Sequence, residues 1–182
     1  CADDFGQSQG INRGILKLLE RGRLQATSVL SQGPAWPDGA ARLRSWFKTS
    51  PAPVDVGLHL NLTHPFRNAD EIRPLSSWLL ASMLRRVPQR EVMDSFLKQV
   101  DTFHYHLGRL PDYIDGHQHV HAFPVVRDIV LQLIDRCWRG QAMRPWLRTP
   151  ERLTGGDAAL KAFVLRVSTR GFGALAESLD LR

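Results

Sequence analysis

The amino-acid sequence predicts an α/β fold with mainly parallel strands, and three observations support this prediction. Segments with strand periodicity alternate with segments of helical periodicity along the chain. No two-residue hairpin turn separates the predicted strands, so helices are expected to join them. A chain of 182 residues with 43% hydrophobic residues can bury a core but is too short for eight typical β/α repeats. We therefore expect a parallel sheet or a barrel, and a barrel would be incomplete.

The first part of the chain alternates helix and strand. Residues 12–21 carry leucine and isoleucine at nearly helical spacing, and Gly22 follows as a stop signal. Small and β-branched residues at 26–30 favour a short strand. A loop is expected at residues 34–37 and a helix at 39–48.

Residues 54–62 are the clearest strand. The apolar side chains occupy every second position, which a strand separates onto one face and a helix does not. The apolar face carries Val54, Val56, Leu58, Leu60 and Leu62, and the other carries Asp55, Gly57, His59, Asn61 and Thr63.

The middle of the chain begins with an insertion. Prolines occur at intervals within residues 64–88, and a short helix is expected near 78–84. Residues 89–107 form the strongest predicted helix, because apolar side chains recur every three or four positions and Gly108 ends the pattern. Beyond it we expect a strand at 113–115, a helix with Pro124 in its first turn, and a helix at 158–167.

Composition restricts the class of protein and its partners. The net charge of +6 comes from basic residues spread along the chain, so no nucleic-acid partner is expected. No apolar run approaches the roughly 18 residues of a membrane span, and no leader is recognised, so a cytoplasmic location is expected. Cys1 and Cys137 are too few for a disulfide framework or a thiolate-only zinc site.

The first residues suggest that the chain is a piece of a longer one. Asp3 and Asp4 are an acidic pair of the kind that follows a buried strand, and no such strand precedes them in the sequence. The last residues end without closing an element. We expect residues 1–182 to form a single catalytic domain that is truncated at both ends.

Histidines and acids stand where they could hold a metal ion. His117, His119 and His121 alternate directly after Asp115-Gly116, and an extended run would project all three imidazoles to one side. His59 lies on the polar face of its strand. This spacing makes a metal site and an ordinary polar face about equally good interpretations. Dinucleotide, P-loop and nucleophilic-serine motifs are missing from the sequence.

Three segments together resemble a known family. They are Ala2-Asp-Asp-Phe-Gly6, Gly57-Leu-His-Leu-Asn-Leu-Thr63 and Asp115-Gly-His-Gln-His-Val-His121. In this order and spacing they are similar to the signature segments of the YdjC-like carbohydrate deacetylases, which include chitooligosaccharide deacetylases and deacetylases of hopanoid-glycoside biosynthesis. The resemblance implies a distorted, incomplete (β/α) barrel with mainly parallel strands, related to the polysaccharide deacetylases.

The resemblance also implies the residues of the site. One divalent metal ion, zinc or magnesium, would be held by Asp4, His59 and His117, and Asp3 would be the general base. Two imidazoles favour zinc over magnesium by ligand softness. The remaining implied pocket residues, in contact with substrate or behind the ligands, are His119, His121 and Asn61. The sequence departs from the family in lacking a late Cys-His-Pro segment, so the general acid is not identified.

The predicted function is metal-dependent hydrolysis of an acetyl group from an N-acetylated sugar, either an oligosaccharide or a glycolipid, by metal-bound water. One alternative is another mononuclear metallohydrolase of amidohydrolase type, and a second metal would indicate a different hydrolase class. The other alternative is a non-catalytic basic binding module, supported by a pI of about 10.0. Whether the chain forms a homo-oligomer is left open.

Overall fold

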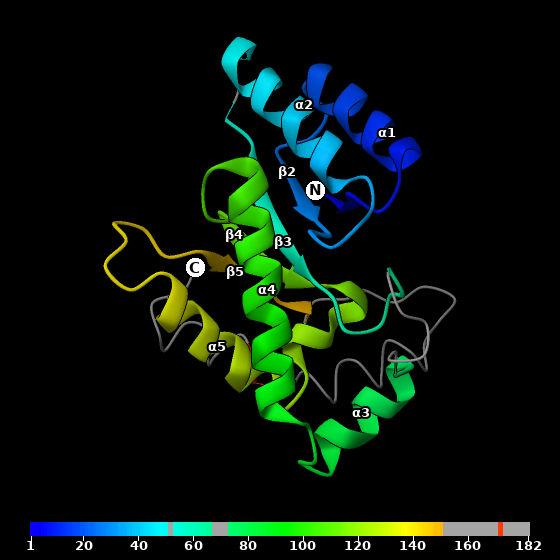
Figure 1. Cartoon of the computed structure of the whole chain (residues 1–182), viewed down its shortest axis with the longest axis vertical. Helices are drawn as coiled ribbons and strands as arrows, with labels where there is room; N and C mark the ends of the chain where they lie inside the picture. The colour runs from blue at the N-terminus through cyan, green and yellow to red at the C-terminus, as the bar shows by residue number, and fades with distance from the viewer. Residues whose placement is uncertain (51–52, 67–72, 151–170, 173–182) are drawn as a thin grey trace.

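The computed structural model describes residues 1–50, 53–66, 73–150 and 171–172 (Figure 1). Within these ranges the elements are β1 (Ala2–Phe5), α1 (Gln9–Glu20), β2 (Ala26–Val29), α2 (Trp36–Thr49), β3 (Asp55–Leu60), α3 (Leu75–Met83), α4 (Gln89–Leu107), β4 (Tyr113–Gly116), the 3₁₀ helix η2 (His117–Ala122), α5 (Val126–Cys137) and β5 (Trp146–Leu147).

The strands form one parallel sheet. Their order in space is β1-β2-β3-β4-β5, and all of the neighbouring pairs are parallel. A sheet whose spatial order follows chain order is typical of a (β/α) barrel, because a doubly wound sheet reverses its order. The predicted α/β fold with parallel strands is therefore confirmed, and the open sheet fits an incomplete barrel.

Most predicted helices are present, with shifts at their ends. The helix predicted at 89–107 has these bounds, and Gly108 ends it in the left-handed conformation with φ 83°. The predicted loop at 34–37 is wrong in its second half, because α2 begins at Trp36. Pro37 fits the first turn, which needs no N–H donor there. Pro124 does not lie in the first turn of α5, since Val125 caps that helix. The helix predicted at 158–167 lies outside the described residues.

The acidic pair does not follow a strand but lies within one, because β1 contains both Asp3 and Asp4. β1 pairs with β2 at Ala2 opposite Thr27 and at Phe5 opposite Val29, so β1 has one residue more than its partner between these pairs. This extra residue is a β-bulge, and Asp4 within it has a φ of 66°. Bulges re-aim side chains next to functional sites, which explains how neighbouring acids reach different partners.

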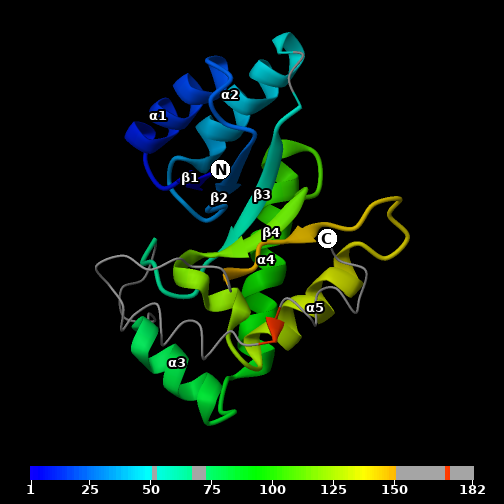
Figure 2. The same ribbon diagram turned by 180° about the vertical axis from the view of Figure 1, so that it is seen from behind.

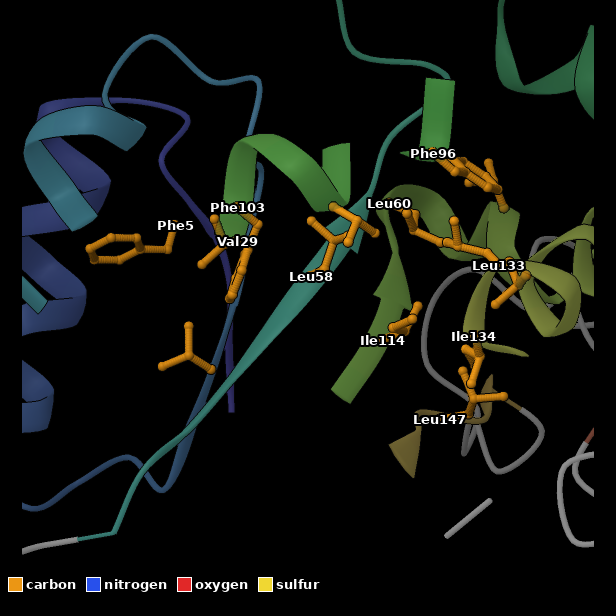
Figure 3. Close-up of a cluster of buried hydrophobic side chains, with 14 of the residues drawn as sticks. Phe5, Val29, Leu58, Leu60, Phe96, Phe103, Ile114, Leu133, Ile134 and Leu147 are labelled. Atoms are coloured by element: carbon orange, nitrogen blue, oxygen red, sulfur yellow. The ribbon is translucent and has the colours of Figure 1, made fainter. Parts of the chain in front are cut away.

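The core lies between the sheet and the helices. α4 crosses in front of the strands in Figure 1 and behind them in Figure 2, so it covers one face of the sheet. Leu58 and Leu60 of β3 are fully buried, as is Phe96 of α4, and all three belong to the hydrophobic cluster of Figure 3. The strand predicted at residues 54–62 is present from Asp55 to Leu60, so the prediction is wrong for residues 61 and 62. Within β3 the alternation leaves His59 on the opposite, inner face.

A glycine of β3 makes room for an aromatic pair on the inner face. The Tyr113 ring stacks on Trp146 with centroids 4.1 Å apart. A Cβ added at Gly57 would lie 2.4 Å from the Tyr113 ring. The side chain at position 57 is therefore restricted to hydrogen by the packing of two neighbouring strands.

We expect Gly57→Ala to destabilise the fold by about 1–3 kcal/mol, because a buried ring must move away from the added methyl group. Gly14→Ala is the matched control. Position 14 lies in α1 with no atom within 4 Å of an added Cβ, and alanine there is expected to stabilise the helix by about 0.5–1 kcal/mol. Urea unfolding of both variants checks the prediction, which fails if Gly57→Ala unfolds at the wild-type midpoint.

No helix in the described part of the chain has the length and apolar character needed to cross a membrane.

Candidate active site

Three predicted ligands meet at the carboxyl ends of the strands. Asp4 comes from β1, His59 from β3, and His117 directly follows β4. The Oδ1 atom of Asp4 lies 3.1 Å from Nδ1 of His117 and 3.5 Å from Nε2 of His59. One ligand atom from each residue lies within 4.8 Å of the others, so the structure brings the predicted ligand set together.

The surroundings of His59 fit a metal ligand. This side chain is buried, and its Nδ1 donates a hydrogen bond to Oδ1 of Asp115 at 2.7 Å. Nε2 is therefore left to face Asp4. A carboxylate behind an imidazole fixes the ring and its tautomer in many metal sites. One carboxylate and two imidazoles are suitable donors for a divalent ion, so the described residues fit the metal that the sequence predicts.

Carboxylates also set the charge of His59. Burial alone would lower the pKa of this imidazole, but Asp115, Asp3 and Asp4 together raise it above its ordinary value. The pKa of Asp4 is lowered, chiefly because His117 donates a hydrogen bond to its carboxylate. Asp4 is therefore ionised at neutral pH, as a metal ligand must be.

Asp3 lies in a second cluster beside the ligands. Arg148 donates hydrogen bonds from one guanidinium nitrogen to Asp3 Oδ1 at 2.7 Å and to Asp115 Oδ2 at 3.2 Å. The Ser28 hydroxyl lies 3.2 Å from Asp3 Oδ1 and 3.2 Å from Nδ1 of His59. Burial would raise the pKa of Asp3, but Arg148 and His59 outweigh burial and lower it. Asp3 is thus an ionised carboxylate within two hydrogen bonds of the ligand cluster.

The expectation of an extended H-x-H-x-H run is wrong. Residues 117–122 form η2, and both Gln118 and His119 have left-handed backbone angles. The physical reason is the loss of a strand partner. Gly116 lies opposite Leu60 in the last pair between β4 and β3, and both chains leave the sheet there. The three imidazoles therefore do not share one side.

The other predicted pocket residues have different surroundings. His121 is 1% exposed, its Nε2 donates to the Arg148 carbonyl at 2.8 Å, and burial lowers its pKa to about 4. His121 therefore holds the strand end that carries Arg148. His119 is half-buried, and its role in substrate contact stays a prediction. Asn61 accepts hydrogen bonds from the backbone N–H groups of Thr63 and His64, so it shapes the turn after β3.

Sequence reasoning missed three residues that complete the site. Asp115 was recognised only as part of a motif, although its register opposite His59 brings the two side chains together. Ser28 lies on the inner face of β2, and the sequence carries no sign of its contacts. Arg148 follows β5 and lies outside the three segments that carry the resemblance. Spacing along one strand could not reveal any of these contacts, because each one joins two strands.

A groove of about 1010 Å³ adjoins the ligand cluster through His64. The His64 ring lies 5.7 Å from the His117 ring, and its Nε2 is 2.8 Å from the side-chain amide nitrogen of Gln7. The groove runs between the loops that follow β2 and β3 on one side and the length of α4 on the other, and its lining includes Phe66, Trp78 and Lys98. Aromatic and polar side chains thus share its walls. Its volume is at the upper end of the roughly 300–1,000 Å³ typical of small-molecule sites.

Comparisons with known proteins identify the family of the chain. The family model described as YdjC-like protein matches residues 1–179. The chain is 31% identical over 149 residues to a chitooligosaccharide deacetylase of Enterobacter sp. (strain 638), covering 79% of this chain and 56% of that protein. It is 33% identical over 143 residues to a carbohydrate deacetylase of Geobacillus stearothermophilus, and this match covers 74% of this chain and 54% of that protein.

A solved structure has the same fold. The chain aligns with a "putative cellobiose-phosphate cleavage protein" of Enterococcus faecalis V583 with a TM-score of 0.61 and 22% identity, covering 92% of this chain and 62% of that one. The chain spans about half the length of the curated relatives described above. The family model, by contrast, covers nearly all of the chain, including the three segments that carry the ligands and Asp3. The chain therefore belongs to the YdjC-like family.

Proposed function

We propose that the protein is a metal-dependent carbohydrate deacetylase that hydrolyses the N-acetyl group of an N-acetylated sugar. The observation that carries the proposal is the convergence of Asp4, His59 and His117, with the ionised Asp3 beside them. The names of the curated relatives support a carbohydrate substrate and deacetylation.

Each residue of the site has a distinct task in this proposal. Asp4, His59 and His117 would hold a divalent ion, which supplies Lewis acidity toward water and the acetyl oxygen. Asp3 accepts the proton of the attacking water. Because Asp115 already occupies Nδ1 of His59, Asp3 is not needed to orient that imidazole, which supports its role as the base.

Arg148 would position the base. Its guanidinium donates hydrogen bonds to Asp3 and Asp115 at once, so it holds the two carboxylates next to each other. The contact with Asp3 also keeps that carboxylate ionised as the pH falls. The residue thus links the base to the carboxylate behind His59.

The groove supports a substrate with more than one sugar unit. It begins at His64, next to the ligand His117, and continues between the loops and α4 with Phe66 and Lys98 in its lining. Sugars combine many hydroxyl groups with apolar ring faces, so a lining of aromatic and polar side chains is suited to them. An acetylated unit at the ligands would leave its neighbour in this groove.

Acetate release tests the proposed function. We expect the chain to release acetate from N-acetylated mono- and oligosaccharides and glycolipids, with the oligosaccharides preferred. A chelator should abolish the activity, and added zinc or magnesium should restore it. Acetate release that a chelator leaves unchanged would contradict the metal-dependent reaction. Release from simple amides in preference to every sugar would favour a metallohydrolase of amidohydrolase type.

Arg148→Gln is expected to move the acidic limb of the pH–activity profile to higher pH. Arg148 lowers the pKa of Asp3, so its removal raises that pKa, and the base becomes protonated and inactive at a higher pH than in the wild type. The profile of kcat/KM between acidic and neutral pH measures the shift. Arg144→Gln is the control, because Arg144 bonds only the exposed Asp135 in the described contacts. If the acidic limbs of the wild type and Arg148→Gln coincide, Arg148 does not control the pKa of the base.

A further inference from the structure

The outward face of α3 is apolar in its second half. Leu80, Met83 and Leu84 are 59%, 60% and 54% exposed, at the end of the helix and its C-cap. The spacing of three and four residues places these side chains next to one another on one helix face. A surface helix ordinarily turns polar residues outward, so this face is unusual.

The opposite side of α3 holds the helix in this orientation. Trp78 and Ser82 are buried, and the Trp78 indole N–H donates a hydrogen bond to the Leu62 carbonyl at 3.1 Å. Figure 1 shows α3 at one end of the molecule, away from α1 and α2. The apolar side chains therefore cannot turn inward without breaking the buried contacts of Trp78.

Positive charge lies beside this apolar face, on its C-terminal side. Residues 73–90 contain four arginines and no acidic residue. Arg85 and Arg86 directly follow the apolar residues, Arg90 lies in the first turn of α4, and all three are exposed. Apolar side chains next to arginines are the pattern by which surface helices bind anionic membranes.

We propose that the outward face of α3, with Arg85, Arg86 and Arg90, binds the surface of a membrane that contains anionic lipids. Charge favours this partner over a second copy of the chain. A two-fold symmetric contact through α3 would bring the same arginines of both copies together, and like charges repel. Lipid phosphates instead neutralise them while Leu80 and Met83 enter the acyl boundary.

The groove lies close to the proposed membrane-binding face. Trp78 lines the groove beside the candidate active site, so a membrane held by the other side of α3 lies near it. This arrangement would present a lipid-linked sugar to the site. That use rests on the proposed function, whereas membrane binding itself does not.

Sedimentation with vesicles tests the proposal. We expect the 182-residue chain to bind phosphatidylcholine vesicles that contain phosphatidylglycerol, to bind pure phosphatidylcholine weakly, and to dissociate as salt rises. Leu80→Ser/Met83→Ser should weaken binding about tenfold or more. Arg85→Gln/Arg86→Gln should weaken it roughly fivefold for each arginine removed.

Matched variants separate this face from the rest of the surface. Tyr105→Ser/Met143→Ser removes exposed apolar side chains elsewhere, and Arg21→Gln/Arg23→Gln removes exposed charges near α1. Both should bind vesicles as the wild type does, and circular dichroism checks that every variant is folded. Equal losses in the control and α3 variants would overturn the proposal. So would a dimer that Leu80→Ser/Met83→Ser dissociates, or the absence of vesicle binding. Because no reaction is measured, the result is independent of deacetylation.

Discussion

Asp4→Ala is expected to lose metal binding and deacetylation together. The carboxylate of Asp4 is the only anionic member of the ligand cluster, and it contacts both imidazoles. Two neutral imidazoles without a carboxylate hold a divalent ion poorly. Metal affinity should fall by more than the roughly 10–100-fold that losing a supporting outer residue costs. Metal content after dialysis and acetate release, measured on the same preparation, check the prediction.

Asp94→Ala serves as the control for this variant, because Asp94 is an exposed acid of α4. It should retain wild-type metal content and turnover. If Asp4→Ala still bound one ion with wild-type affinity, the ligand set would have to be assigned to other residues.

Asp3→Asn is expected to keep its metal while acetate release falls by roughly two to four orders of magnitude, the usual contribution of a general base. The amide preserves the size of the side chain and still accepts the hydrogen bond from Arg148. All of the ligands Asp4, His59 and His117 remain. Metal content and kcat on the same protein separate loss of the base from loss of the site.

Asp115→Asn is the sharpest comparison, because Asp115 is a carboxylate bound to the same arginine but placed behind His59. It should weaken metal binding by about 10–100-fold, as outer carboxylates do, and excess metal should restore much of its turnover. If Asp3→Asn behaves in this way too, or turns over normally with excess metal, Asp3 is not the base.

Local patterns predicted most of the fold. The period-two alternation of residues 54–62 indicated both a strand and the face on which His59 lies, and the structure confirms both over residues 55–60. The apolar spacing of residues 89–107 predicted α4 with its observed bounds. Such patterns predict structure correctly because a strand or helix buries one face against the core, and the spacing of apolar residues within that element shows which face it is.

Predictions failed where backbone hydrogen bonding between distant segments decided the conformation. The run from His117 to His121 has a strand-like alternation, yet it folds into η2 because the pairing with β3 ends at Gly116. The acids of β1 likewise depend on a bulge against β2, which brings Asp4 to the histidines and Asp3 to Ser28. Neither feature is recorded in the residues of one segment.

The sequence by itself determined the class of fold and the buried faces of its main elements. Through three segments in family order, it also predicted the candidate ligands Asp4, His59 and His117, which the structure brings together. Only the tertiary structure decided what surrounds them. Asp115 supports His59 because two parallel strands pair in one register, and Arg148 reaches Asp3 because β5 adds to β4. Hydrophobic periodicity is a property of neighbouring residues, whereas register is set by contacts across the whole sheet.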